Sequence, residues 1–300
     1  MTERYCGHTF KHMAAMRIMP ECRACLIRLV DLAVSLASSE FLVQQAARQA
    51  ALHIIDREFG PEAIPALIAN HFQAEIRKIT GNPDPFRAYK NLETAFLARQ
   101  FEVVAAAFPQ NLESLLKLAV LGNAVDFFRA PEEVRREFSQ NLNFAVCHLK
   151  ALKERLASKP SLMLYLADNA GEQYFDAPLV HYLRGLGWRV LYVVKGGPIQ
   201  NDLTLADLTD SGLLKKLEPV IDTGAQTVGL VLSETSPAFQ STYRQAQLIL
   251  AKGMGHFETL SHKADVRLFF LLQAKCRPVA QALRVPLGSF VFAHAPEICP

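Results

Sequence analysis

The sequence has few of the features that would place it in a membrane or in an oxidising compartment. It contains no run of about 18 uninterrupted apolar residues, so a transmembrane helix is not expected. Six cysteines in 300 residues are too few for a disulfide scaffold, and only Cys22 and Cys25 are closely spaced. The first residues lack the continuous apolar stretch of a signal peptide. We therefore expect a reduced, cytoplasmic protein without a membrane partner.

Several common catalytic and cofactor motifs are also missing. The sequence has no G-x-x-x-x-G-K-S/T loop, no G-x-G-x-x-G turn and no G-x-S-x-G elbow. The net charge is only +3, and no dense block of Lys or Arg gives the footprint of a nucleic-acid binder. These absences argue against a nucleotide hydrolase, a dinucleotide-dependent enzyme, a serine hydrolase and a nucleic-acid partner.

The first half of the chain has the pattern of amphipathic helices. With 50% hydrophobic and 20% charged residues the composition is that of a globular protein, and the length favours two packed lobes. Residues 1–20 show no clear periodicity and are expected to form a loose leader. Apolar residues then recur at three- and four-residue spacing, with Gly and Pro at the breaks. Helices are predicted over residues 21–36, 41–58, 62–79, 86–107, 110–127 and 131–157, so an all-helical lobe is expected over 21–158.

The pattern changes at Pro160, where short, nearly unbroken apolar runs begin. Such runs are typical of strands that are covered on both faces. Strands are predicted at residues 162–167, 190–194, 228–232, 248–251, 266–272 and 290–293. Segments of helix or turn separate them, which favours a doubly wound, mostly parallel sheet. The predicted fold class is therefore α/β, with the α/β domain over residues 159–300.

Polar residues follow three of the predicted strands, where open α/β sheets bind their ligands. Asp168, Asn169 and Asp202 offer the hard oxygen ligands that Mg²⁺ or Mn²⁺ prefers. Lys195 and Lys252 are point charges suited to a phosphate, and adjacent glycines such as Gly253 let backbone N–H groups approach an anion. Each acidic residue, taken alone, is equally well explained as the cap of the next helix. Three such strand ends together favour a metal and phosphate site.

The same segments resemble the successive motifs of one family, the metal-dependent damage-control phosphatases. The likeness lies in residues 168–172, 194–204 and 252–258, and continues through 220–224 and Lys275-Cys276. Upstream it extends to Asp84-Pro85-Phe86 with Lys90 and Asn91, and to Gly122-Asn123 with Asp126. The Cys22-x-x-Cys25 pair resembles the mark of the family's prokaryotic branch. The resemblance covers residues 19 to about 293.

This resemblance implies a phosphatase of small phosphorylated metabolites that uses Mn²⁺, Co²⁺, Ni²⁺ or Mg²⁺. By position, Asp168, Asn169 and Asp202 match the family's metal ligands, and Lys252 matches a lysine that binds the substrate phosphate. The same comparison places three further residues around the cleft: Glu172, Asn201 and Lys195. The sequence departs from the family's pattern at Gly197 and Gln200, and at His256, where an Asn is common. The last departure concerns the contacts to substrate more than the metal site.

Two aspects of the predicted site have open alternatives. Asp168 or Glu172 is expected to orient the attacking water, and covalent attack by Asp168 is a further option. Residues of the helical lobe are expected to face the cleft, and helix capping and hydrogen bonding between the lobes are the equally weighted alternative; the candidates are Asp84, Asn91, Asn123 and Asp126.

The cysteine pair and the overall function also have competing interpretations. Cys22 and Cys25 are candidates for a redox pair or for half of a second metal site, and equally for two packed thiols. The main functional prediction is a metal-dependent phosphatase of sugar phosphates or reactive phosphoesters. The alternatives are methyl transfer from S-adenosylmethionine to a carboxylate, and a non-catalytic redox or ligand-binding module centred on the cysteine pair. The sequence does not indicate an oligomeric state.

Overall fold

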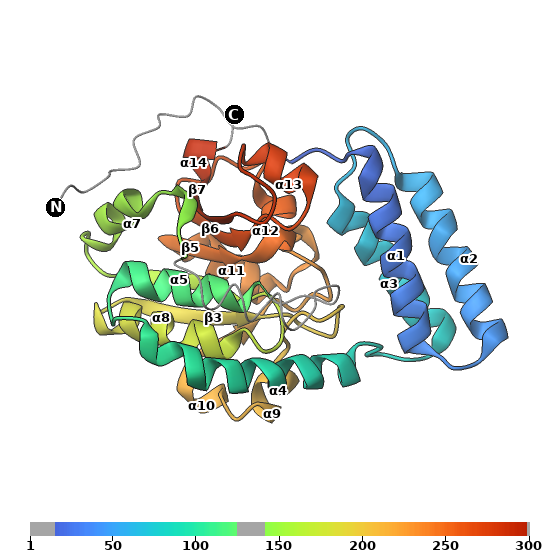
Figure 1. Cartoon of the computed structure of the whole chain (residues 1–300), viewed down its shortest axis with the longest axis horizontal. Helices are drawn as coiled ribbons and strands as arrows, with labels where there is room; N and C mark the ends of the chain where they lie inside the picture. The colour runs from blue at the N-terminus through green and yellow to red at the C-terminus, as the bar shows by residue number, and fades with distance from the viewer. Residues whose placement is uncertain (1–15, 125–141, 299–300) are drawn as a thin grey trace.

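The computed structural model describes residues 16–124 and 142–298, in which a bundle of three helices lies beside an α/β unit (Figure 1). The helices are α1 Pro20–Ala37, α2 Phe41–Glu58, α3 Pro65–Thr80, α4 Arg87–Val104, α5 Leu112–Gly122, α7 Leu149–Leu156, α8 Gln173–Gly185, α9 Leu205–Asp210, α10 Leu214–Leu217, α11 Pro237–Gln245, α12 Gly253–Leu260, α13 Arg277–Ala282 and α14 Ala295–Ile298. The strands are β1 Phe144–Cys147, β2 Leu162–Leu166, β3 Arg189–Val194, β4 Val220–Asp222, β5 Leu248–Lys252, β6 Leu268–Gln273 and β7 Phe290–His294.

The strands form one sheet in the order β1-β7-β6-β5-β2-β3-β4. Every neighbouring pair is parallel except β6 and β7, so the predicted α/β class with a mostly parallel sheet is confirmed. The chain leaves β2 for β3 on one side and returns from β4 to β5 on the other side of β2. The order of the strands therefore reverses between β2 and β5, which is where open α/β sheets open a crevice for ligands.

The apolar strand runs form because both faces of the sheet are covered. Successive side chains of a strand point to opposite faces, and β2 alternates in this way. Met163 and Tyr165 join a core beneath α5 and α8, while Leu164 and Leu166 join a second core beneath α11, α12 and α13. All four side chains are buried. The central strands can therefore be apolar at nearly every position.

The three-helix bundle has a separate core. Val30 of α1, Ala47 and Ile55 of α2 and Phe72 of α3 are buried together in it. Proline stands in the first turn of α1 and of α3, where its missing N–H costs nothing. Helix α4 then leads from this bundle along the α/β unit, and α5 packs against α8 over the sheet (Figure 1). The helical lobe is thus shorter than the predicted segment 21–158.

Two secondary-structure predictions were wrong. The helix predicted over 131–157 is interrupted by β1, which pairs in parallel with β7, and only α7 follows it; residues 131–141 lie outside the described part. The strand predicted at 228–232 does not form. Its backbone hydrogen bonds go to side chains instead, since the N–H of Val228 donates to Asn70 Oδ1 at 2.7 Å and that of Leu230 to Thr259 Oγ1 at 3.0 Å. The fourth strand in the sequence is β4, eight residues earlier.

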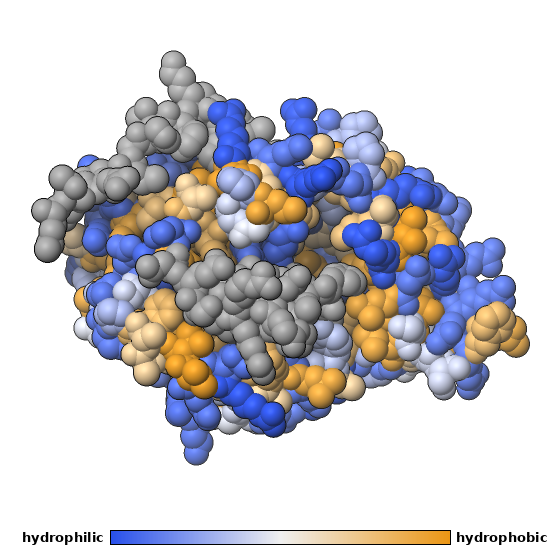
Figure 2. Space-filling view, viewed as in Figure 1, coloured by the Kyte–Doolittle hydropathy of each residue, from blue (hydrophilic) through white to orange (hydrophobic). Residues whose placement is uncertain are grey.

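The surface is mixed in character. Figure 2 shows hydrophilic residues over much of the visible face, with hydrophobic residues in separate groups. Phe41 and Leu42, at the start of α2, are among the most exposed large hydrophobic side chains. Within the described ranges, no helix combines the length and the apolar character needed to cross a membrane.

Candidate active site

The polar strand ends meet at one cavity. It has a volume of about 700 Å³ and lies at the carboxyl ends of β2 and β3. Four of the site residues predicted at strand ends line it together, two after β2 and two from the loop after β3: Asp168, Asn169, Asn201 and Asp202. Asn169 and Asp202 also form an isolated backbone bridge. The strand-end rule therefore brings the predicted metal ligands to a common cavity, as expected.

Two amide side chains tie together the carboxylates of Asp168 and Glu172. Asn123, at the end of α5, donates from Nδ2 to Asp168 Oδ2 at 2.8 Å and to Glu172 Oε1 at 2.9 Å. Asn169 donates to the same two oxygens at 3.0 and 2.7 Å. The orientation of the Asn123 amide is set because its Oδ1 accepts the backbone N–H of Gln273 at 3.2 Å. Amide N–H groups from two separate segments therefore hold the two carboxylates side by side.

Burial and mutual repulsion govern the charges of this group. Burial, and then the neighbouring charges of Glu172 and Asp202, raises the pKa of Asp168 well above its ordinary value. Burial also raises the pKa of Asp202, although Lys195 acts in the opposite direction. For Glu172, burial opposes ionisation, but the Lys252 ammonium outweighs it and the pKa is lowered. Asp168 and Asp202 are thus two carboxylates that nearby positive charge would stabilise.

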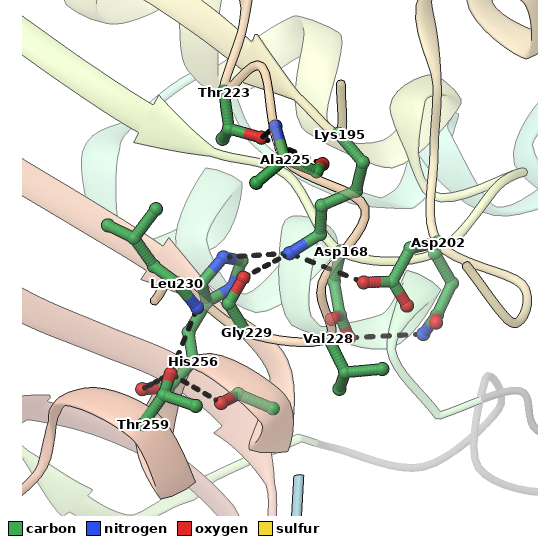
Figure 3. Close-up of polar contacts among 12 residues, drawn as sticks. Asp168, Lys195, Asp202, Thr223, Ala225, Val228, Gly229, Leu230, His256 and Thr259 are labelled. Atoms are coloured by element: carbon green, nitrogen blue, oxygen red, sulfur yellow. Dashed lines mark hydrogen bonds and ion pairs between the residues drawn. The ribbon is translucent and has the colours of Figure 1, made fainter. Parts of the chain in front are cut away.

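Lys195 lies beside Asp202 at the inner end of the site (Figure 3). Its ammonium donates to the carbonyl of Gly229 at 2.6 Å and lies 3.3 Å from both Asp202 Oδ2 and His256 Nε2. His256 Nδ1 lies 2.6 Å from the carbonyl oxygen of Lys252, so this nitrogen carries the proton and Nε2 accepts from Lys195. Burial, and then the charge of Lys195, lowers the pKa of His256 far below its ordinary value. The histidine is therefore a neutral partner of Lys195.

The structure does not place Lys252 as a phosphate ligand. Its ammonium is fully buried and donates to the carbonyl of Ala119 at 2.8 Å. It also makes ion pairs of 2.6 Å with Glu172 and with Asp176. These three acceptors match the three donors of an ammonium group. Because this strand-end lysine is turned inward among them, it neutralises Glu172 and Asp176 beneath the cavity instead of lining it.

Asn201 and Gly253 hold neighbouring parts of the site in place. Asn201 Nδ2 donates to Glu93 Oε2 at 3.1 Å, and its carbonyl accepts the N–H of Ala170 at 2.8 Å. Gly253 has φ +80°, and a Cβ added there would lie 1.9 Å from Asp168 Oδ2. A glycine is required at this position because the carboxylate occupies the space of a side chain. Gly253 thus lets Asp168 approach the start of α12.

The cleft residues predicted from the helical segments divide into two groups. Asn123 lines the cavity, as expected. Asp84 instead pairs with the buried Lys90 at 2.9 Å, and Asn91 is exposed on α4; neither lines the cavity. Both predictions were therefore wrong in placement. Asp126 lies outside the described residues.

Sequence reasoning gave no role to Lys275, a residue of the cavity wall. Lys275 follows β6, which runs parallel to β5, and it lines the same cavity. Its charge acts on both Asp168 and Glu172. The signal that identifies it is the one used for the other strand ends, namely a polar residue directly after an apolar run. Lys275 is therefore the lysine at the cavity wall, in the place that the sequence analysis gave to Lys252.

The donor set fits a hard divalent cation. Asp168 and Asp202 supply carboxylate oxygens and Asn169 an amide oxygen, which are the ligand types that Mg²⁺ and Mn²⁺ take. A cation there would also offset the repulsion that raises the pKa of Asp168. No three His, Cys, Asp or Glu side chains in the described ranges are grouped to hold a metal ion, so this candidate set depends on the Asn169 amide.

The cysteines of the described ranges are not grouped in a second metal centre. Cys22 is buried near the start of α1, and its sulfur accepts the backbone N–H of Met19 at 3.4 Å. Cys25 and Cys276 border the cavity. Burial raises the pKa of all three thiols, that of Cys276 to about 12, so they are protonated at neutral pH. The raised pKa values favour neutral thiols over reactive thiolates; Cys22 is packed in the interior, whereas Cys25 is exposed.

Glu258 on the same wall predicts a pH-dependent stability. Burial raises its pKa to about 7, although its Oε2 accepts the backbone N–H of Ala66 at 3.0 Å. Because the pKa of Glu258 is raised in the folded state, its carboxyl group contributes to the free energy of unfolding below the ordinary pKa of 4.5. This contribution is lost as the pH rises through about 7. We expect Glu258→Gln to match the wild type at pH 4.5. At pH 8 the variant should be more stable by about 1–3 kcal/mol in urea unfolding.

The matched control for this measurement is an exposed glutamate. Glu154→Gln removes the same charge from a side chain that is 67% exposed, and should leave the pH dependence unchanged. If the wild type and Glu258→Gln have the same free energy of unfolding at pH 4.5 and at pH 8, Glu258 ionises normally in the folded protein and the prediction is wrong.

Comparison with known proteins identifies the family. A family model described as "Damage-control phosphatase ARMT1-like domain" matches residues 18–291. The chain belongs to this family. It is 36% identical over 282 residues to Damage-control phosphatase PH1575 of Pyrococcus horikoshii, covering 92% of this chain and 97% of that protein. A damage-control phosphatase of Archaeoglobus fulgidus is 28% identical over 288 residues, covering 92% of this chain and 98% of that protein.

A solved structure of the family has the same fold. The crystal structure of the duf89 family protein ph1575 of Pyrococcus horikoshii superposes with a TM-score of 0.83 at 34% identity. The match covers 93% of this chain and 99% of that chain. Both the α/β fold and its arrangement of helices are therefore those of the ARMT1-like family. The names of its relatives support a phosphatase function for this member.

Proposed function

We propose that this ARMT1-like protein hydrolyses small phosphate monoesters with the help of a divalent cation held by Asp168, Asn169 and Asp202. The observation that carries the proposal is that these three side chains line one cavity at the point where the strand order reverses. The proposed cation is Mn²⁺, Co²⁺, Ni²⁺ or Mg²⁺. When bound, it supplies charge neutralisation and polarisation of a phosphate oxygen.

In this proposal, side chains and backbone N–H groups of the protein bind and position the phosphate. Phosphoryl transfer needs positioning and electrostatic stabilisation more than covalent chemistry. In the proposal, the ammonium of Lys275 and the backbone N–H groups at the start of α12 bind the other phosphate oxygens. Lys195, held between Gly229 and His256, keeps Asp202 in place and adds positive charge behind it.

The hydrogen bonds favour Asp168 over Glu172 as the carboxylate that acts on the nucleophile. Both oxygens of Glu172 are engaged, Oε1 by Asn123 and Asn169 and Oε2 by Lys252. Glu172 is also absent from the described cavity wall, whereas Asp168 is part of it. In the proposal, Asp168 orients the attacking water, and Glu172 is a positioning residue that holds the two amides.

Release of inorganic phosphate tests this function directly. Purified protein is treated with EDTA, dialysed and assayed with a panel of phosphorylated metabolites, with each of the four cations added in turn. We expect no turnover after EDTA and recovery with at least one cation, because the two buried carboxylates need its charge. Turnover that resists EDTA would contradict the proposed role of the metal.

The same panel separates the alternative functions. A methyltransferase would consume S-adenosylmethionine and methylate a carboxylate without releasing phosphate. A non-catalytic module would release no phosphate with any cation. Either result would overturn the phosphatase proposal, provided that circular dichroism shows the protein to be folded.

A further inference from the structure

The helical bundle contributes one charged side chain to the cavity among the residues that the structure describes, namely Arg28 of α1. The other charged residues on the cavity wall come from the α/β unit, and they are Asp168, Asp202, Glu258 and Lys275. The bundle lies beside the α/β unit (Figure 1). The cavity wall therefore carries positive charge from two separate parts of the fold, Lys275 after β6 and Arg28 on α1.

The charge of Arg28 is not neutralised by an acidic neighbour. Within residues 16–124 and 142–298, no carboxylate forms an ion pair with it. Its partner is the thiol of Cys25, one turn earlier on α1, which accepts a hydrogen bond from the guanidinium group. Burial raises the pKa of Cys25 although Arg28 acts in the opposite direction, so this thiol is neutral. A guanidinium group has five N–H donors, and Arg28 is exposed, so most of its donors are accessible to a ligand in the cavity.

Arg28 is separate from the charges that surround the proposed cation site. Lys195 and Lys275 are the cations that act on the carboxyl group of Asp168, and Arg28 is not among the main charges there. It is not among those that act on Asp202 either. Coulomb interactions weaken with distance and with exposure to water, so Arg28 lies in an outer part of the cavity. A phosphate bound at the strand ends therefore leaves Arg28 available for another group of the substrate.

The cavity has room for a ligand that reaches both places. Its volume of about 700 Å³ lies within the range of about 300–1,000 Å³ that is usual for small-molecule sites. A guanidinium group presents paired N–H donors that match two oxygens of a carboxylate or a phosphate. Such charge-assisted hydrogen bonds are about twice as strong as those to a neutral acceptor. Arg28 therefore favours a negatively charged group over an uncharged one.

We propose that the substrate is a phosphate monoester with a second anionic group, a carboxylate or another phosphate, and that Arg28 binds this second group. This inference rests on the proposed phosphatase function and names the substrate class for the same site. The phosphate to be released lies with the proposed cation and Lys275 at the strand ends. The second anion lies at the wall that α1 forms, so the helical bundle supplies a specificity-determining residue.

Phosphate esters that differ in one charge test the proposal. The esters are phosphoglycolate, 4-phosphooxybutanoate and 6-phosphooxyhexanoate, and each is compared with its own primary amide, which has the same size without the second charge. The value of kcat/KM is measured at a fixed concentration of free activating cation. In at least one pair we expect the carboxylate to exceed the amide by about tenfold or more.

A second series distinguishes the two kinds of anion. The bisphosphates of 1,4-butanediol and 1,6-hexanediol are compared with the amides of the same chain length. A preference for a bisphosphate identifies phosphate as the second group, and a preference for a carboxylate identifies the carboxylate. If no carboxylate and no bisphosphate is preferred over its amide, the inference is overturned.

Matched variants locate the second anion. Arg28→Gln removes the charge, and should bring the ratio of the preferred anionic ester to its amide to about one. Arg28→Lys keeps the charge without the paired donors and should give an intermediate ratio. Arg23→Gln makes the same change on α1 in a residue that pairs with Asp56 and does not border the cavity, and should keep the wild-type ratio. Both arginines are exposed, so neither change disturbs the core.

The outcomes distinguish this inference from the proposed function. A wild-type ratio in Arg28→Gln would show that another group binds the second anion. If the amides are hydrolysed as well as the anionic esters, the phosphatase proposal stands and this inference alone is wrong. If no ester releases phosphate with any cation, the phosphatase proposal fails and this inference fails with it.

Discussion

Asp168→Asn is expected to lower the metal-stimulated release of phosphate by on the order of a thousandfold or more. The substitution keeps the size of the side chain but removes a carboxylate that lines the cavity beside Asn169 and Asp202. It should therefore weaken both cation binding and the orientation of the attacking water. The measurement is kcat/KM with saturating cation, together with cation binding by calorimetry.

Folding provides the control for this variant. Burial, and then the charges of its neighbours Glu172 and Asp202, raises the pKa of Asp168, so ionising this carboxyl group is less favourable in the metal-free folded protein than in the unfolded chain. Asp168→Asn should thus be no less stable than the wild type without cation. Asp210→Asn, an exposed change in the Arg87 ion pair, should keep full activity. Wild-type turnover by Asp168→Asn would exclude this carboxylate from the reacting centre.

Lys252→Met is expected to reduce the free energy of unfolding by about 3–5 kcal/mol. The ammonium group is fully buried between Glu172 and Asp176, so its removal leaves two carboxylates without their counter-charge. Urea unfolding followed by fluorescence or circular dichroism measures the loss. Lys150→Met, whose side chain is 93% exposed, should change the stability by less than about 0.5 kcal/mol.

A double variant tests whether charge balance is the cause. In Lys252→Met, the carboxylates of Glu172 and Asp176 have lost their counter-charge, and Asp176→Asn removes one of them. The double variant should therefore be more stable than Lys252→Met alone. If Lys252 were a phosphate ligand, its substitution would raise KM while leaving the stability near that of the wild type. That result would reverse the structural assignment.

The central sheet could be predicted because its strands are covered on both faces. Strands β2, β3 and β5 are nearly continuous apolar runs, and each is followed by a polar group that marks its carboxyl end. Strands β1 and β4 were missed because they have only four and three residues and lie at the sheet edges, partly exposed. Short edge strands leave too little periodicity to be recognised.

The site could be predicted where it follows strand ends and not where it depends on contacts between distant segments. Asp168, Asn169 and Asp202 reach a common cavity by the topology alone. The direction of a side chain at a strand end is set by its tertiary neighbours. Lys252 turns inward because Ala119 and Asp176 supply acceptors there, and neither is near it in the sequence.

The position of β7 has a consequence for how the protein is made. This strand is the last of the sheet in the sequence, yet it lies between β1 and β6. Until the ribosome has released residues 290–294, β1 has no neighbour to pair with and β6 keeps one open edge. The nascent chain can therefore assemble the β6-β5-β2-β3-β4 part, which includes the cavity's strand ends, before the sheet is complete. Strand β1 can pair with β7 only after nearly half of the chain has been synthesised beyond it.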